Sequence, residues 1–200
     1  MKYLAVDLGD VICKVDFDNF KKQQSIAANI SLDDAEYFLN RTQKSHDLGM
    51  TSISDELHDH FKIKSEPLVN GLVKEWNKTI AINSKMKHFL EEMITKGVNV
   101  ALLSNIGIDH SSVIRSVLGE TIYDNSIRFF SCNIGVRKPT YLYYKTFIDM
   151  YSKFAGCLYI DDIQENIDTA KLFGLNAINF SLSRMDDHEL EEKLKTFRSL

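Results

Sequence analysis

Polar and charged residues follow the ends of several short apolar runs in this sequence. They are Asp7, Ser104 with Asn105, Lys138, and the pair Asp161 and Asp162. Because the carboxyl ends of parallel strands meet at one edge of a sheet, we expect these side chains to lie close together. Carboxylates, a lysine and a hydroxyl gathered there would suit an anion bound beside a divalent cation.

The adjacent acids Asp161 and Asp162 are the most informative of these residues. Two neighbouring carboxylates repel each other, and a bound divalent ion relieves that repulsion. Mg²⁺ takes one or two carboxylate ligands and keeps several waters. The alternative is a doubled helix cap. We favour a magnesium site.

Each of the other positions also has a purely structural interpretation. Asp7 fits a turn or helix cap. Ser104 can hold phosphate oxygens together with neighbouring backbone N–H groups, or it can cap a helix. Lys138 can point toward an anion beside a helix that starts at Pro139, or it can be a solvated surface lysine. The functional interpretation is more specific for the four segments together than for any one of them, because each lies at or just past a predicted strand end.

The elements that position these residues can be inferred from apolar patterning. Short apolar runs predict strands at residues 3–6, 98–103, 157–160 and 177–180, with a weaker one at 129–131. Apolar stripes with helical spacing predict helices at 86–94, 144–151, 163–174 and 190–197. Unalternated strands that alternate with helices indicate a doubly wound α/β fold with a parallel sheet.

Residues 15–84 differ, because they carry helical stripes and no convincing strand. A block of this length exceeds an ordinary strand-to-strand connection, so we interpret it as an inserted helical cap. Residues 1–14 and 85–200 then form the core domain. Ser31 and Asp34 fit a capping box at the start of one cap helix. The alternative is that these helices simply cover the sheet.

The composition is ordinary for a soluble globular protein, with 44% hydrophobic and 26% charged residues. The chain has 200 residues, a formal net charge of -4 and three cysteines far apart in sequence. We therefore expect no nucleic-acid partner, no membrane partner, and reduced thiols in a cytoplasmic protein. The sequence does not indicate an oligomeric state.

The four segments resemble the four signature motifs of the haloacid dehalogenase-like (HAD) hydrolases. The resemblance extends from Tyr3 to about Phe180 and implies a Rossmann-like core with an inserted helical cap. The start at residues 7–9, the loop at residues 137–139 and the acidic segment at residues 161–166 resemble a branch of small-cap sugar-phosphate phosphatases. The cap segments at 46–49 and 53–56, followed by Trp76, are similar to that branch as well.

The resemblance implies a role for each matched residue in a phosphatase reaction. Asp7 would be the nucleophile that forms an aspartyl-phosphate, which splits one difficult step into two. Ser104 and the Asn105 backbone would bind the phosphoryl oxygens. Lys138 would neutralise charge on both the nucleophile and the phosphate, which otherwise repel each other.

The same resemblance implies a magnesium site. Asp7, the carbonyl of Gly9 and Asp162 would bind Mg²⁺. Asp161 would belong to the same metal shell, and Asn166 would support it.

Gly9 departs from a common pattern of these phosphatases. Many of them carry a second aspartate two residues after the nucleophile, as general acid and base, and here that position has no side chain. Proton transfer typically contributes ~100- to 10,000-fold, so its loss would slow turnover. Asp10 is offset by one residue and we expect it to point elsewhere.

Two alternatives remain open. A 2-haloacid dehalogenase could use Arg41 and Gln43 in the cap, although dehalogenases of this superfamily need no Mg²⁺ and lack the acidic pair. A protein that binds phosphoryl groups without turnover is the other, because fold does not fix function.

The cap should set substrate choice. His46, Asp47, Arg41 and Trp76 are candidates to face the site, although we expect Trp76 in the core and Arg41 in solvent. We expect His46 and His110 to be exposed. A small cap favours a small phosphorylated metabolite, such as a sugar phosphate or nucleotide.

Overall fold

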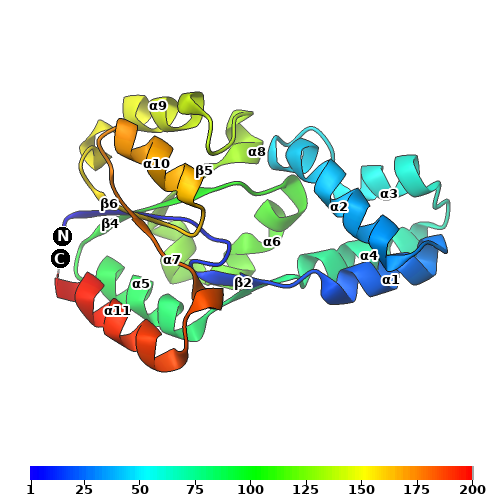
Figure 1. The fold of residues 1–200 in the computed structure, drawn as a ribbon, viewed down its shortest axis with the longest axis horizontal. Coiled ribbons are helices and arrows are strands. Elements are labelled where there is room, and N and C mark those ends of the chain that lie inside the picture. Colours follow the sequence, from blue (N-terminus) through cyan, green and yellow to red (C-terminus); the bar gives the residue numbers. More distant parts are fainter. Residues whose placement is uncertain (200) are drawn as a thin grey trace.

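The centre of the computed structural model, which describes residues 1–199, is a parallel sheet of five strands (Figure 1). In spatial order the strands are β5 Ser126–Phe130, β4 Asn99–Ser104, β1 Tyr3–Val6, β6 Leu158–Asp161 and β7 Asn176–Asn179. The chain first builds outward from β1 through β4 and β5, and then returns to build β6 and β7 on the other side. This reversal leaves a crevice at the carboxyl ends of the strands beside β1.

Alternate residues of the strands face two separate apolar layers. Leu4 and Val6 of β1 belong to one layer and Ala5 to the other. The first layer is covered by α5 Ser84–Thr95, α6 Ile108–Leu118, α7 Glu120–Asp124 and α11 Asp187–Ser199. The second is covered by α9 Tyr141–Met150 and α10 Gln164–Leu172.

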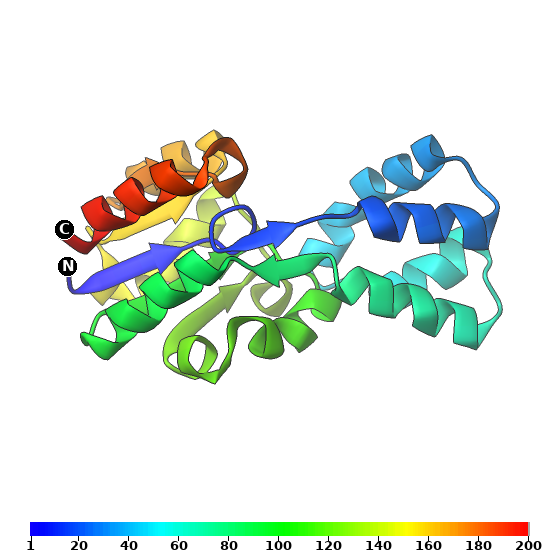
Figure 2. The same cartoon turned by 90° about the horizontal axis from the view of Figure 1, so that it is seen from below.

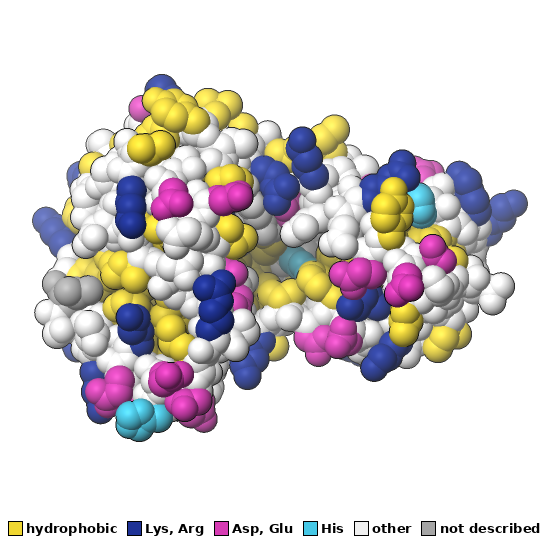
Figure 3. Space-filling view, viewed as in Figure 1, with side chains coloured by type: hydrophobic (Ala, Val, Ile, Leu, Met, Phe, Trp, Pro, Cys, Tyr) yellow, Lys and Arg dark blue, Asp and Glu magenta, His cyan; other side chains and the backbone are white. Residues whose placement is uncertain are grey.

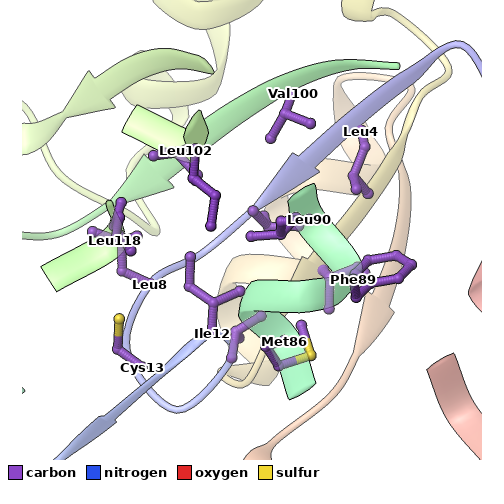
Figure 4. Close-up of a cluster of buried hydrophobic side chains, with 14 of the residues drawn as sticks. Leu4, Leu8, Ile12, Cys13, Met86, Phe89, Leu90, Val100, Leu102 and Leu118 are labelled. Carbon is purple, nitrogen blue, oxygen red and sulfur yellow. The ribbon is translucent and has the colours of Figure 1, made fainter. Parts of the chain in front are cut away.

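Figure 4 shows the first layer, where Phe89 and Leu90 of α5 pack against Leu4 of β1. These side chains are fully buried. Burial of each large apolar side chain stabilises the fold by about 1.5–3 kcal/mol. Because both faces are covered, residues 4–6 of β1 and 158–160 of β6 are apolar without alternation, which is why the sequence shows continuous apolar runs there. The predicted α/β class is confirmed.

The observed strands lie within a few residues of the predicted runs. The weak run at 129–131 is the end of β5, which starts earlier than its apolar pattern because Ser126 and Arg128 interrupt it. Beyond Phe130 the chain forms the short helix α8 Ser131–Ile134. Two single turns of 3₁₀ helix, η1 Ser152–Phe154 and η2 Leu182–Arg184, complete the connections.

Four helices lie apart from the sheet and share an apolar cluster of their own (Figure 2). They are α1 Asp18–Ala28, α2 Leu32–Asp47, α3 Ile53–Phe61 and α4 Glu66–Asn77, called here the helical unit. Phe20, Phe38, Leu57 and Trp76 are among the cluster's members. The capping box predicted at Ser31 is confirmed. The division of the chain into domains at residues 15 and 84 stays a prediction.

The expectation that residues 15–84 contain no strand is wrong at the edges of that block. β2 Cys13–Val15 pairs antiparallel with β3 Ile80–Ile82, so a two-stranded ribbon joins the helical unit to the sheet. Strands of three residues are too short to show alternation, and their existence depends on a partner far along the chain. This ribbon brings both ends of the helical unit to the end of β1.

The expectation that Pro139 starts a helix is also wrong. α9 begins at Tyr141 with Thr140 at its N-cap, so Pro139 lies in the preceding loop. The three cysteines are unpaired, as expected. Within residues 1–199, no helix combines the length and apolar character needed to cross a membrane.

Candidate active site

Asp7 is fixed at the carboxyl edge of the central strand. Its backbone N–H donates to the carbonyl of Ile160 in β6 at 2.9 Å. Directly after it, the carbonyl of Leu8 accepts from the N–H groups of Ile12 and Cys13 at 3.0 and 2.8 Å, which turns the chain away. The Asp7 side chain is only 9% exposed. Its carboxylate is therefore held beyond the sheet, in the crevice beside β1.

Lys138 is buried among acids and is not a solvated surface residue. Its side chain is 1% exposed, and Nζ lies 2.9 Å from Asp7 Oδ1 and 2.7 Å from Asp161 Oδ2. Nζ also donates to the carbonyl of Leu103 at 2.8 Å. A buried ammonium needs such compensation, since burial of an unpaired charge costs several kcal/mol. Lys138 thus ties together three neighbouring strand ends.

Asn105 positions Lys138 through the lysine's backbone. Asn105 Nδ2 donates to the Lys138 carbonyl at 2.9 Å, and Asn105 Oδ1 accepts from the Lys138 N–H at 2.8 Å. Ser104 ends β4, is buried and lines the same cavity. Neither residue caps α6, whose N-cap is Gly107. The helix-cap interpretation of Ser104 is therefore wrong.

Asp161 is saturated with donors, whereas Asp162 faces the cavity. Asp161 Oδ1 accepts from the N–H of Ile163 and from Asn166 Nδ2, both at 2.9 Å. Asp161 Oδ2 accepts from Lys138 and from the Tyr159 hydroxyl. Because its oxygens are engaged, Asp161 serves the site mainly by holding Lys138. Asp162 lines the cavity together with Asp7.

Three carboxylates can reach one cation. Oxygens of Asp7, Asp161 and Asp162 all lie within 4.8 Å of one another. Two unit charges at about 4 Å repel by about 4 kcal/mol at an effective dielectric near 20, so one lysine leaves part of this charge unbalanced. Carboxylate oxygens in such a cluster are the ligands of hard divalent cations. The donor set fits a cation held chiefly by Asp7 and Asp162.

The pKa values of Asp7, Asp161 and Asp162 differ because the three carboxylates receive different numbers of hydrogen bonds. Burial, reinforced by the charge of Asp161, raises the pKa of Asp7 to about 6 despite the neighbouring Lys138. Burial, with the charges of Asp7 and Asp161, raises the pKa of Asp162 to about 7. Burial also acts on Asp161, but Lys138 and the other donors outweigh it and lower its pKa. Asp7 and Asp162 therefore gain most from a bound cation.

The structure shows an open space at Gly9. A Cβ on Gly9 would meet only the Val15 Cγ2 atom, at 3.8 Å, so the glycine is not required for steric reasons. Asp10 does not replace a side chain there. Its Oδ2 accepts from the Ser181 and Ser183 hydroxyls at 2.5 and 2.8 Å, and its Oδ1 accepts from the Ser183 N–H. As expected, Asp10 points elsewhere and holds a distant loop.

A cavity of about 300 Å³ connects this cluster to the helical unit. Figure 3 shows the surface hollowed between the two parts of the molecule. On the sheet side the lining includes Asp7, Ser104, Lys138 and Asp162. On the helical side it includes Lys21, Glu36, Asn40, Gln43, His46, Asp47 and Trp76. The cavity beside the carboxylates is therefore bounded by both parts of the molecule.

The expectation that His46 and His110 are exposed is wrong. They are 4% and 8% exposed, and both line the cavity. His110 stacks on Trp76 with ring centroids 4.8 Å apart, and its Nε2 lies 3.0 Å from the Trp76 carbonyl. Burial lowers the pKa of both histidines. Only the packing of the helical unit on α6 covers these rings, and sequence patterning does not predict that contact. Arg41 is exposed, as expected.

An ion pair across the cavity was not predicted from the sequence. Arg137 Nη2, from the loop before Lys138, lies 2.9 Å from Oδ2 of Asp47, the last residue of α2. Asp47 is 6% exposed. Burial raises the pKa of Asp47 to about 6; Arg137 and Lys138 oppose that shift, while Asp7 adds to it. Arg137 precedes Lys138, a predicted site residue, and that adjacency is the one sequence signal that marked it.

Solved structures of similar fold cover nearly the whole chain. A HAD family enzyme from Bacteroides thetaiotaomicron, in complex with magnesium and inorganic phosphate, superposes with a TM-score of 0.76 at 17% identity, over 94% of this chain and 98% of that one. A HAD phosphatase from Thermococcus onnurineus gives 0.62 at 17% identity, over 90% and 86%. An L-2-haloacid dehalogenase from Xanthobacter autotrophicus gives 0.59 at 16% identity, over 98% and 83%.

No family model matches the sequence, and no curated protein matches it either. The structural neighbours are therefore the link to known proteins, and at this identity they establish the fold. The chain has the fold of the HAD superfamily, so the fold expected from the four motifs is confirmed. A phosphatase and a dehalogenase both occur among the neighbours, so the choice of chemistry depends on the residues of this site.

Proposed function

We propose that this protein is a Mg²⁺-dependent hydrolase of phosphoric monoesters that works through an aspartyl-phosphate on Asp7. The observation that carries the proposal is the arrangement around Lys138. A nucleophile candidate, a buried cation and two further carboxylates meet at one strand edge. An anionic nucleophile can approach an anionic phosphate only where positive charge offsets their repulsion, and here Lys138 and a bound divalent cation would supply that charge.

The side chains around Asp7 divide the work of binding and attack. Ser104 and the Asn105 backbone bind the phosphoryl oxygens at the end of β4. Lys138, held by Asn105 and Asp161, stays between the nucleophile and the phosphate. Because Lys138 is fixed by buried partners, it needs no rearrangement when charge develops during the reaction. Asp7 attacks phosphorus, and water then hydrolyses the aspartyl-phosphate.

Magnesium fits the donor set of the site. The ion, when bound, would neutralise charge on the carboxylates and on the transferring phosphoryl group. Asp7 and Asp162 would hold it, with the Gly9 carbonyl as a third ligand. Asp161 lies within reach of the same position, and Asn166 fixes Asp161. The raised pKa values of Asp7 and Asp162 support a cation there, because both acids lack enough neighbouring positive charge.

The proposed substrate is a small phosphorylated metabolite, such as a sugar phosphate or nucleotide. We interpret the helical unit as the cap, because it closes one side of the cavity above the carboxylates. The cap contributes polar side chains, including Asn40 and Gln43, that can bind hydroxyl groups. A volume of about 300 Å³ is at the lower end of ordinary small-molecule sites.

Phosphate release is the direct test. Wild type, Asp7→Asn and the control Asp168→Asn, an exposed acid on α10, would be compared on 4-nitrophenyl phosphate and on a panel of phosphorylated metabolites. Each would be assayed with Mg²⁺ and with a chelator. We expect turnover by wild type and Asp168→Asn only with Mg²⁺, and none by Asp7→Asn, because no other residue here replaces the nucleophile.

Release of phosphate by Asp7→Asn at the wild-type rate would contradict the aspartyl-phosphate route. Turnover of phosphopeptides alone would contradict the proposed substrate class. Binding of Mg²⁺ and phosphate by a wild-type protein that releases nothing would identify a phosphoryl-binding protein without turnover.

A haloacid dehalogenase is among the proteins of similar fold, so dehalogenation is a second candidate function. Gln43 lines the cavity, but Arg41 does not. A dehalogenase needs no cation, so the crowded carboxylates of Asp7 and Asp162 would have no purpose. Halide release from 2-haloacids in the presence of a chelator is the observation that would favour this candidate over the phosphatase.

A further inference from the structure

The cap contributes a buried carboxylate that neither the motifs nor the metal site uses. Asp47 ends α2, lines the cavity that contains Asp7, and is 94% buried, having 6% of its surface exposed. Its Oδ2 lies 2.9 Å from Arg137 Nη2 but has no hydrogen bond within residues 1–199, and neither has Arg137 Nε. Buried polar atoms normally find partners, so both groups are arranged for a polar ligand in the cavity.

Among the described residues of the core, no carboxylate beside Asp7 is free to act as acid or base in the proposed reaction. Gly9 has no side chain, Asp10 is engaged by Ser181 and Ser183, and Asp161 is engaged by Lys138. In the proposed reaction Asp7 attacks phosphorus, and Asp7 and Asp162 hold the cation, so neither is free to transfer the proton. Asp47 is the remaining carboxylate among the described residues that line this cavity close to Asp7, apart from Glu36, which pairs with Lys21.

We propose that Asp47 is the general acid and base of the reaction, supplied by the cap in place of the side chain missing at Gly9. This inference rests on the proposed phosphatase function. Asp47 enters the cavity from α2, whereas Asp7 enters from β1, so the two carboxylates approach a bound phosphoryl group from different parts of the molecule.

The proton balance closes over the two steps. As Asp7 forms its bond to phosphorus, the bond from phosphorus to the ester oxygen breaks, and Asp47 gives its proton to that oxygen. Asp47 then takes a proton from the water that attacks the aspartyl-phosphate, and the bond from phosphorus to Asp7 breaks. The net reaction is ester plus water to alcohol plus phosphate, with both aspartates restored.

The surroundings of Asp47 suit both roles. Its pKa of about 6 reflects burial first, then the opposing charges of Arg137 and Lys138 and the like charge of Asp7. A group with a pKa near the working pH can both give and take a proton. Arg137 also stabilises the carboxylate that forms when the proton leaves.

Leaving-group dependence tests this role. Wild type and Asp47→Asn would be compared on 4-nitrophenyl phosphate, whose leaving group needs little help, and on phenyl phosphate, whose more basic leaving group needs a proton. We expect kcat/KM of the variant to fall at least ~100-fold on phenyl phosphate and at most ~10-fold on 4-nitrophenyl phosphate. We also expect a burst of 4-nitrophenol equal to the enzyme concentration, because hydrolysis of the aspartyl-phosphate has lost its base.

Two variants serve as controls. Asp33→Asn, at an exposed position in the first turn of the same helix, should leave both substrates unaffected. Asp47→Glu keeps a carboxyl group and should restore part of the phenyl phosphate activity. A residue that only held Arg137 in place would give no such pattern, because neither the leaving group nor the attacking water would depend on its proton.

The possible outcomes separate this inference from the proposed function. Equal losses on both substrates without a burst would overturn the role of Asp47 and leave the phosphatase standing. A wild-type protein inert on every phosphate ester would overturn both. If Asp47→Asn fails to fold, the wild-type rates across a series of aryl phosphates test the role of Asp47 instead. A shallow dependence of the rate on leaving-group basicity supports a proton donor, and a steep dependence contradicts it.

Discussion

At the scale of single residues, the site is governed by how few positive charges its acids share. Lys138 lies between Asp7 and Asp161, but Asp161 also receives the Ile163 N–H, Asn166 and the Tyr159 hydroxyl. Hydrogen bonds to a charged form lower the pKa of an acid, and burial without them raises it. The different pKa values of Asp7 and Asp161 follow from this difference in donors.

Removal of the lysine charge should cost both stability and activity. Lys138→Met leaves Asp7 and Asp161 buried without their shared cation. We expect a loss of about 3–5 kcal/mol in the free energy of unfolding, measured with urea, together with loss of phosphate release. The same change at Lys153, which is exposed, should alter neither. Unchanged stability of Lys138→Met would show that water can stabilise the charges of Asp7 and Asp161 in place of the lysine.

Asp162 should make the metal-free protein less stable as the pH rises. Its folded pKa is about 7, above the ordinary value of 3.8, so the folded state binds the proton more tightly than the unfolded state does. The free energy of unfolding should therefore fall between about pH 4 and pH 7, with no contribution below that window and a constant penalty above it.

The variant Asp162→Asn removes that penalty. At about pH 8 with a chelator, we expect it to stabilise the protein by on the order of 1–2 kcal/mol, after allowance for solvent screening, with little effect near pH 4. Mg²⁺ should stabilise wild type but not the variant. Urea unfolding with and without Mg²⁺ measures both effects, and a variant still stabilised by Mg²⁺ would place the ion elsewhere.

At the scale of elements, close backbone contacts hold the helical unit against the sheet. The end of α2 lies on α8, and at Gly49 a Cβ would come 2.5 Å from the Cys132 carbonyl oxygen. The backbone at Gly49 also has a φ of +69°, which side chains rarely adopt. A glycine two residues after Asp47 therefore sets where the end of α2, with its carboxylate, meets the core.

Gly49→Ala should displace the end of α2. The added methyl group clashes with backbone, which cannot move aside as a flexible side chain would. We expect a loss of roughly 1–3 kcal/mol in stability and a lower rate of phosphate release, since the end of α2 can no longer pack on α8 as it does here. Urea unfolding and the aryl phosphate assay measure the two effects.

Gly71→Ala is the matched control for that change. Gly71 lies within α4, and a Cβ there meets nothing within 4 Å. Alanine in a helix interior is favoured over glycine by roughly 0.5–1 kcal/mol, so this variant should be slightly more stable and fully active. If both variants behaved alike, contact of α2 with α8 would not control the position of the cap.

At the scale of the whole molecule, the junction between the two parts carries the single tryptophan. Trp76 ends the stripe of α4, belongs to the apolar cluster of the helical unit, and lines the cavity. It stacks on His110 of α6, and the N–H of Ile53 in α3 donates to Asp109 of α6 at 2.8 Å. The expectation that Trp76 is a core residue is confirmed, and it also contributes to the site.

Trp76 should therefore report occupation of the cavity. We expect its fluorescence emission to change when Mg²⁺ and orthovanadate, a phosphate analogue, are added together to wild type. Asp162→Asn, which lacks a proposed ligand of the ion, should show a much weaker response at the same concentrations. Calorimetric binding without any change in emission would mean that the occupant does not reach the cap side of the cavity.

Local patterns in the sequence were enough to predict the α/β class and the segments that meet at the site. Short apolar runs ending in Asp7, Ser104 and Asp161 specify strand ends, and a parallel sheet brings such ends to one edge. These are local patterns, so they can be read without knowledge of distant contacts. The loop that contains Lys138 was assigned to the site because it lies between the Ser104 and Asp161 segments in the chain.

Which residues share charge and which face the cavity depends on contacts between segments that are distant in the chain. The burial of His46 and His110, the ribbon of β2 with β3, and the pairing of Arg137 with Asp47 all join residues far apart in the chain. Hydrophobic periodicity gives a residue's place on its own element but not the partner that covers it. The separation of the pKa values of Asp7 and Asp161 depends on such partners, because desolvation and charge act through space.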